Sequence, residues 1–141
     1  MKPFAIGFVA FVFVGLGLLN WLLFGDRSSF QTGLSKLEGL PPAASDITVY
    51  QERNITGEFV TDFRIAESNL VVFAAEKQWD LQPIVGSALA CQAVAFREKR
   101  PNDRKEIVDG LYYSKRMPNG GGVTVAYDRK GGRAYIERSS R

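Results

Sequence analysis

The feature that most constrains this chain is an uncharged apolar segment of 21 residues, Phe4 to Phe24. Only Asn20 within it is clearly polar. As an α-helix it would be roughly 31 Å long at about 1.5 Å per residue, which matches a bilayer core of about 30 Å. Because a helix satisfies its own backbone hydrogen bonds in lipid, the segment predicts an N-terminal transmembrane anchor over residues 1–25.

The alternative interpretation of this segment is a cleaved secretory signal. The apolar region of a signal is about 7 to 15 residues long, and a small-residue cleavage site of the A-x-A type should follow it. Gly25, Asp26 and Arg27 follow instead. We therefore expect a retained signal-anchor that contacts lipid through its large apolar side chains: Phe4, Phe8, Phe11, Phe13, Leu18, Trp21 and Phe24.

The charges beside the apolar segment predict its orientation. Lys2 and the N-terminal amine precede it, whereas Arg27 follows it directly after Asp26. The positive-inside bias favours a cytoplasmic N-terminus. We expect a single-pass protein of the cell (inner) membrane, whose remaining residues lie outside the cytoplasm, in the periplasm of a bacterial source.

Charge is distributed unevenly over the rest of the chain. Residues 26–96 contain 5 Lys/Arg and 9 Asp/Glu, whereas residues 97–141 contain 12 Lys/Arg and 6 Asp/Glu. The two parts either attract each other within one fold or present a basic face to anionic headgroups or an acidic partner. Nucleic acid is not expected as a partner, because an anchored extracytoplasmic domain seldom meets it.

Alternating patterns predict strands in the soluble part of the chain. Residues 46–53 and 58–65 alternate around a polar turn, which indicates a β-hairpin. An antiparallel meander is predicted over residues 110–117, 123–128 and 133–137, with a tight turn at Gly131-Gly132.

Two further segments bear on the helix content. Residues 70–79 have helical spacing. Residues 85–100 fit a helix or a strand, and their alanine content favours a helix. The predicted fold class is α+β: an N-terminal transmembrane helix, a linker over residues 26–44, and a domain over residues 45–141 with a small antiparallel sheet of about five strands packed against one or two helices.

Catalytic patterns are scarce. The chain has no histidine, which removes Ser-His and Cys-His nucleophile pairs and the usual zinc sites. Ser114 and Lys115 are adjacent on a predicted strand, so their side chains point to opposite faces. Cys91 is expected to be a small buried core residue, and Asp62 and Glu67 are expected in structural ion pairs. We predict no catalytic residue, no cofactor and no metal.

The most concentrated group of cations lies around the last predicted turn. Arg129, Lys130 and Arg133 would form a basic tip that could contact headgroups or a partner protein. This basic tip is the candidate contact site outside the anchor.

Together these patterns favour a non-enzymatic binding domain that acts as an accessory or assembly subunit of a larger membrane protein complex. An alternative is a periplasmic immunity or inhibitor protein against a toxic enzyme, for which the uneven charge would form a docking surface. A second alternative is an enzyme that uses paired carboxylates or Ser-Lys chemistry.

Overall fold

The computed structural model describes residues 28–53, 57–100 and 102–140. In chain order these residues form β1 (Ser28–Leu34), β2 (Ser45–Glu52), β3 (Glu58–Arg64), α2 (Glu67–Glu76), β4 (Gln82–Pro83), β5 (Ala88–Ala90), α3 (Ala93–Arg97), β6 (Lys105–Ile107), β7 (Gly110–Arg116), β8 (Gly122–Asp128) and β9 (Arg133–Ser139).

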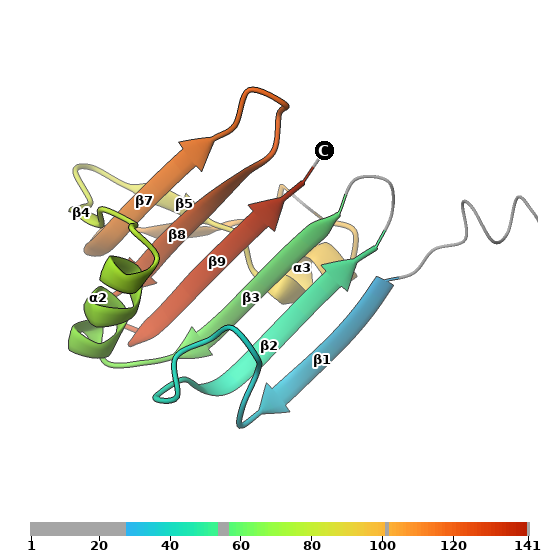
Figure 1. Cartoon of the computed structure of the whole chain (residues 1–141), viewed down its shortest axis with the longest axis horizontal. Coiled ribbons are helices and arrows are strands. Elements are labelled where there is room, and N and C mark those ends of the chain that lie inside the picture. Colours follow the sequence, from blue (N-terminus) through green and yellow to red (C-terminus); the bar gives the residue numbers. More distant parts are fainter. Residues whose placement is uncertain (1–27, 54–56, 101, 141) are drawn as a thin grey trace, which may run out of the picture.

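A seven-stranded antiparallel sheet is the centre of the fold (Figure 1). Its strand order is β1-β2-β3-β9-β8-β7-β4, and β5 and β6 form a separate two-stranded sheet. The β2-β3 hairpin and the β7-β8-β9 meander are brought together by the pairing of β3 with β9. This long-range pairing joins the hairpin and the meander, each made of strands that are close in sequence, into one continuous sheet.

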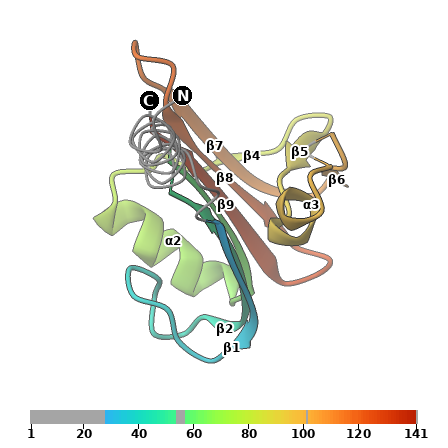
Figure 2. The ribbon, with the colours of Figure 1, turned by 90° about the vertical axis from the view of Figure 1, so that its right-hand side faces the viewer.

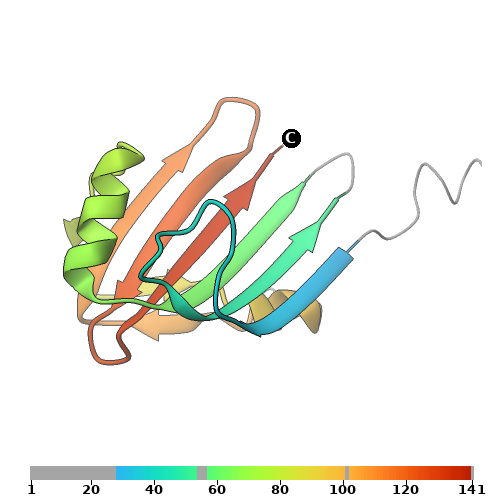
Figure 3. The same ribbon diagram turned by 60° about the horizontal axis from the view of Figure 1, so that its bottom comes forward.

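The sheet is covered on both faces (Figure 2). Helix α2 and the connection between β1 and β2 lie on one face, which we call the α2 face (Figure 3). Helix α3 and the β5-β6 sheet lie on the other, the α3 face. The larger core lies on the α2 face and includes fully buried Ile47, Phe63, Leu70, Val125 and Ile136.

Helix α2 packs through the side chains of Leu70, Phe73 and Ala74, which helical spacing places on one side. The chain then reverses at Gln78, whose φ of 59° is left-handed, and the amide of Trp79 donates to the carbonyl of Ala74 at 2.8 Å. The predicted helix over residues 70–79 is confirmed with different bounds, Glu67–Glu76, and the turn after it directs Trp79 back toward the sheet.

The predicted fold class is wrong. We expected an α+β domain of about five strands packed against one or two helices behind an N-terminal transmembrane helix. The described residues are instead mostly antiparallel sheet, with seven strands in the main sheet, two in the second sheet, and two short helices. The expected N-terminal helix lies outside the described residues, and no helix within residues 28–53, 57–100 and 102–140 is long and apolar enough to cross a membrane.

Strand β1 is the largest departure from the sequence-based expectation, because it lies in the range 26–44 that we expected to be a linker. It is an edge strand with only Phe30 and Leu34 half-buried and the rest exposed. A strand exposed on both faces needs no alternation of apolar and polar residues, so periodicity cannot reveal it. The domain division at residues 25 and 44 stays a prediction.

The ambiguous range 85–100 contains both kinds of structure, strand β5 and helix α3. The first turn of α3 has no cap from its own N-terminal residue. Asp62 of β3 caps it instead, because its Oδ2 accepts a hydrogen bond from the amide of Ala93 at 3.0 Å. A cap supplied from another element leaves no local sequence signal, which explains why the range could not be assigned. The hairpin over 46–53 and 58–65 and the meander over 110–137 are confirmed.

Candidate functional site

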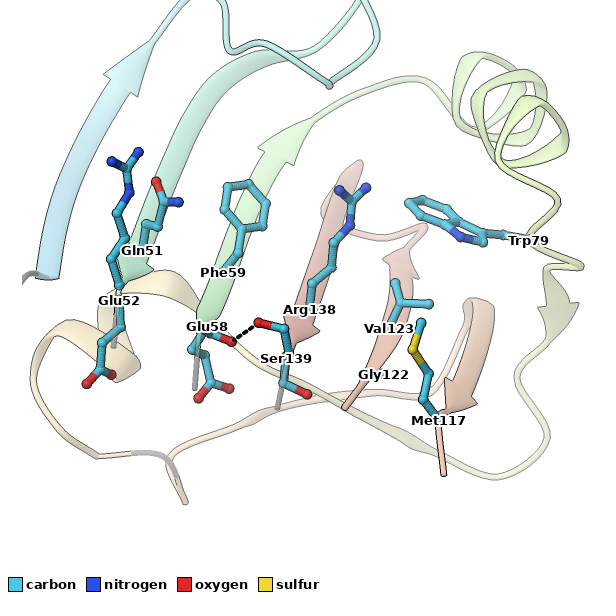
Figure 4. A pocket seen from close by; sticks show the side chains of 13 residues that line it. Gln51, Glu52, Glu58, Phe59, Trp79, Met117, Gly122, Val123, Arg138 and Ser139 are labelled. Carbon is cyan, nitrogen blue, oxygen red and sulfur yellow. Dashed lines mark hydrogen bonds between the residues drawn. The ribbon is translucent and has the colours of Figure 1, made fainter. Parts of the chain in front are cut away.

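One end of the α2 face is left open by α2 and the β1-β2 connection. A groove of about 610 Å³ lies there (Figure 4). It crosses the sheet from Gln51 on β2 to Val123 on β8, and Trp79 and Met117 form its far side. Three strand spacings of about 4.8 Å give it a length of roughly 14 Å.

Arg138 lies in the middle of this groove, between two aromatic rings. The centre of its guanidinium is 5.9 Å from the ring centroid of Phe59 and 5.3 Å from that of Trp79. Both distances fall within the range of cation–π attraction. The two rings therefore hold the guanidinium at a defined position over the sheet.

The strand register explains this arrangement. Phe59 of β3 is directly opposite Arg138 of β9, which in turn is opposite Val123 of β8. Directly opposed residues project from the same face of a sheet, so the three side chains form one row. Trp79 joins them from above the sheet because it stacks on Tyr113 of β7, with ring centroids 6.4 Å apart.

Trp79 is also fixed from its other side. The ring of Phe73 on α2 meets it edge to face at 5.6 Å. Trp79 is thus held by a helix residue and a strand residue at once, and the groove wall it forms is rigidly placed. A site built on such supported elements retains its shape without a ligand.

The electrostatics of Arg138 are unusual for this protein. Its side chain is half-buried, and it forms no ion pair or hydrogen bond within the described residues. Burial lowers the pKa of its guanidinium from the ordinary value. An arginine still remains charged at neutral pH, so Arg138 is a partly desolvated cation with five N–H donors and no carboxylate partner among the described residues. Glu52 and Glu58 also line the groove, but their carboxylates point away from Arg138 (Figure 4).

Two other arginines of the described chain, in contrast, are bound to carboxylates. Arg133 donates from Nε and Nη2 to Oδ1 of Asp62 at 2.8 and 2.6 Å, and from Nη1 to Asp46 at 2.8 Å. Arg129 donates to both carboxylate oxygens of Glu67 at 2.7 and 2.8 Å and to Asp109 at 2.8 Å. Arg138 differs from the exposed unpaired cations of the described chain because its guanidinium is half-buried, and this combination is its distinctive chemical feature.

These ion pairs also show where the predicted basic tip lies. Arg129 and Arg133 are both engaged by carboxylates, and among the three predicted cations only Lys130 forms no ion pair with a described residue. The use of the tip as a contact site stays a prediction. The seven predicted anchor residues between Phe4 and Phe24 lie outside the described residues.

The candidate catalytic groups do not converge. Ser114 faces Thr124, with hydroxyl oxygens 3.2 Å apart, while Lys115 pairs with Val123 along the strand. Asp62 and Glu67 belong to separate ion pairs, as expected for structural roles. Within the described part of the chain no group of three metal-ligating side chains occurs. That the protein is not an enzyme and takes no cofactor stays a prediction.

Cys91 is buried, as predicted. Its thiol donates a hydrogen bond to Glu137 at 2.5 Å. Burial raises the pKa of the thiol far above its ordinary range, and the neighbouring carboxylate raises it further. A thiol held protonated in this way is not a nucleophile.

Sequence reasoning missed the groove, because it ended the last strand at residue 137. A signal was nevertheless present in β9. Ala134 and Ile136 point to the α2 face, and Arg138 has the same parity. When alternate residues of a strand are apolar and the next one in the same series is a cation, that cation lies on the core-facing side of the sheet.

No protein-family model, no curated protein and no solved structure matches this chain. The functional argument consequently depends on the residues and their geometry.

Proposed function

We propose that this chain is a single-pass, membrane-anchored binding domain whose groove receives an acidic segment of a partner protein in a membrane complex. The anchor would be the apolar segment over residues 4–24, with the N-terminus cytoplasmic and the sheet domain extracytoplasmic. The observation that carries the proposal is the unpaired guanidinium of Arg138 between Phe59 and Trp79.

A carboxylate is the group that would complete this arrangement. A half-buried cation without an anion has lost part of its hydration and gained no partner. A carboxylate in the groove would form short, charge-assisted and commonly bidentate hydrogen bonds with the guanidinium. Neither ring accepts a conventional hydrogen bond, so the N–H donors of the guanidinium stay available for this pairing.

The lining of the groove favours an apolar side chain beside that carboxylate. Val123 and the half-exposed Met117 lie next to Trp79, and methionine adapts readily to different partners. The length of roughly 14 Å suits about four extended residues. The best occupant is therefore a short peptide segment with an acidic residue next to an aromatic or aliphatic one, which is a common hot-spot composition opposite Arg and Trp.

Site-specific photo-crosslinking in the native membrane tests this function. A photoreactive amino acid replaces Met117 in the full chain, and the adduct is mapped by mass spectrometry. We expect one discrete membrane-protein adduct whose crosslinked peptide contains an acidic residue. Arg138→Gln should abolish the adduct, because the amide retains a polar side chain without the charge.

Arg129→Gln is the matched control, since it removes a guanidinium that is already paired. This control should leave the adduct unchanged. Adducts that persist equally in the Arg138→Gln chain, or the absence of any adduct, would show that the groove does not dock a partner.

A further inference from the structure

The tether between the proposed anchor and the sheet is very short, and this inference rests on that proposed anchor. Strand β1 begins at Ser28, whereas the apolar segment ends at Phe24. Only Gly25, Asp26 and Arg27 lie between them. Three residues span at most about 10 Å, so the sheet must stand next to the headgroup layer.

The strand register shows which end of the sheet is brought to the bilayer. Ser28 pairs with Glu52, and Glu52 with Glu58. The same row continues through the pairs Glu58–Ser139, Gly122–Ser139 and Arg116–Gly122. We call this row of strand termini the Ser28 end. It includes the β7-β8 loop, whose first residue, Met117, is 51% exposed.

Exposed cations without carboxylate partners gather at the Ser28 end. Arg53, Lys115 and Arg116 are exposed and form no ion pair with a described residue. The acids of this end are Glu52, the last residue of β2, and Glu58, the first residue of β3. The β7-β8 side of the Ser28 end is therefore its cationic part.

The opposite end of the sheet has a different charge arrangement. Its arginines Arg64, Arg129 and Arg133 are all bound to carboxylates, and Lys105 contacts Asp128 at 2.6 Å, whereas Lys130 forms no ion pair with a described residue. Paired charges attract an anionic surface weakly, because their fields cancel over a short distance. The electrostatic contrast between the two ends matches the direction that the short tether imposes.

A polar hollow of about 450 Å³ lies on the α3 face at the Ser28 end. Arg104 and Arg116 line it together with Lys115, but Lys115 pairs with Val123 in the strand register, so its side chain projects from the α2 face, beside the hollow and not into it. Its remaining wall consists of hydroxyls, the glycine loop and one acid: Ser114, Thr124, Ser139, Tyr112, Gly120, Gly121, Gly122 and Glu137, with Val123 as an apolar neighbour. Guanidinium and hydroxyl groups together are suited to phosphate oxygens.

The one acid of the hollow is already committed to other groups. Glu137 accepts a hydrogen bond from the thiol of Cys91 and lies 3.9 Å from Arg104. Arg116 forms no ion pair with a described residue and remains available to an incoming phosphate, and Lys115 precedes it at the same strand end. Met117 directly follows Arg116, and its exposed apolar side chain suits the boundary between headgroups and acyl chains.

We propose that the Ser28 end docks on the bilayer and that the polar hollow receives the phosphate of an anionic phospholipid. The domain then stands upright with its strands directed away from the membrane. Docking in this orientation would place the open end of the Arg138 groove close to the bilayer surface, where a neighbouring membrane protein emerges.

The test uses the full chain in nanodiscs, with an environment-sensitive fluorophore on Met117→Cys in a Cys91→Ser background. Nanodiscs of phosphatidylcholine are compared with nanodiscs that also contain phosphatidylglycerol. We expect a blue shift with phosphatidylglycerol that high salt weakens. Each cation near an anionic surface raises the ratio of docked to undocked domain roughly fivefold or slightly more. The double variant Lys115→Gln with Arg116→Gln should therefore lower this ratio about thirtyfold.

The matched control is Arg129→Gln with Lys130→Gln at the opposite end, which should leave the blue shift unchanged. Equal emission in the two lipid compositions, or equal effects of the two double variants, would overturn the inference. Loss of the shift on addition of inorganic phosphate to the phosphatidylglycerol nanodiscs, at constant ionic strength, would show a free-anion site instead and would also overturn it. Arg138→Gln should not affect docking, so a failure here is separable from a failure of the proposed groove.

Discussion

The ion pair between Arg133 and Asp62 offers the sharpest stability prediction. Oδ1 of Asp62 accepts two hydrogen bonds from Arg133, and its Oδ2 accepts one from the amide of Ala93. The Asp62 side chain is only 9% exposed, and that of Arg133 is 19% exposed. Replacement of Arg133 by Met would leave a buried carboxylate with a single hydrogen bond.

Removal of one partner of a buried ion pair costs about 3–5 kcal/mol. We take the lower end, about 3 kcal/mol, because Arg133 reaches the surface at Asp46. Domains of this size have a free energy of unfolding of about 5–15 kcal/mol, so the loss is a large fraction of the total. With a urea slope of about 1.5 kcal/mol per molar, the unfolding midpoint of Arg133→Met should fall by about 2 M.

Urea unfolding of the full chain in detergent micelles, followed by tryptophan fluorescence, measures this change. The chain has two tryptophans, so a Trp21→Phe background leaves Trp79 as the only reporter. Arg129→Met is the matched control, because Arg129 makes equally short ion pairs at the same turn but its partners are exposed. Its midpoint should move far less.

A double variant separates a lost ion pair from a simple packing defect. Asp62→Asn with Arg133→Met should be more stable than Arg133→Met alone, because no buried charge is left unpaired. Equal midpoints for Arg133→Met and Arg129→Met, or no recovery in the double variant, would refute the assignment of a buried ion pair that stabilises the sheet.

Three further outcomes follow from the structure. Burial raises the pKa of Asp128, but the hydrogen bond from Lys105 and those from the amides of Gly131 and Lys130 outweigh it, so the net pKa lies below the ordinary value. The stability that this lowered pKa contributes is present at neutral pH and is lost as pH falls below about 4. Asp128→Asn should therefore weaken the fall in melting temperature at acid pH, and an unchanged fall contradicts this. Cys91 should react with Ellman's reagent only in denaturant, and fast labelling of the folded chain would disprove the raised pKa of its thiol. Gly110→Ala should cost about 1–3 kcal/mol in urea unfolding, because the new Cβ would lie 1.7 Å from the carbonyl oxygen of Tyr127; unaltered stability would argue against this close approach.

The parts of the fold that could be predicted are those with a local signal. The β2-β3 hairpin, the β7-β8-β9 meander and helix α2 follow from alternation, turn residues and helical spacing. Strand β1 and helix α3 could not be found in this way. The edge strand has no buried face to impose a pattern, and the short helix depends on a cap from Asp62 in a distant strand.

The same distinction applies to the candidate site. The groove is made where β3 meets β9, and this pairing joins Phe59 to a residue far along the chain. Trp79 enters the site only because the chain reverses after α2. The hydrophobic pattern predicts neither the β3-β9 pairing nor the chain reversal after α2. The sequence could therefore indicate a charge at a core-facing position of β9, but not the aromatic rings around it.

Neutron reflectometry of the full chain in a supported bilayer tests whether the sheet domain stands on the membrane. We expect a protein layer that begins within about 10 Å of the headgroups, because only three residues separate Ser28 from the proposed anchor. A water-filled gap much wider than that, or protein that rinses away from the bilayer in buffer, would rule out the proposed anchor and the docked sheet.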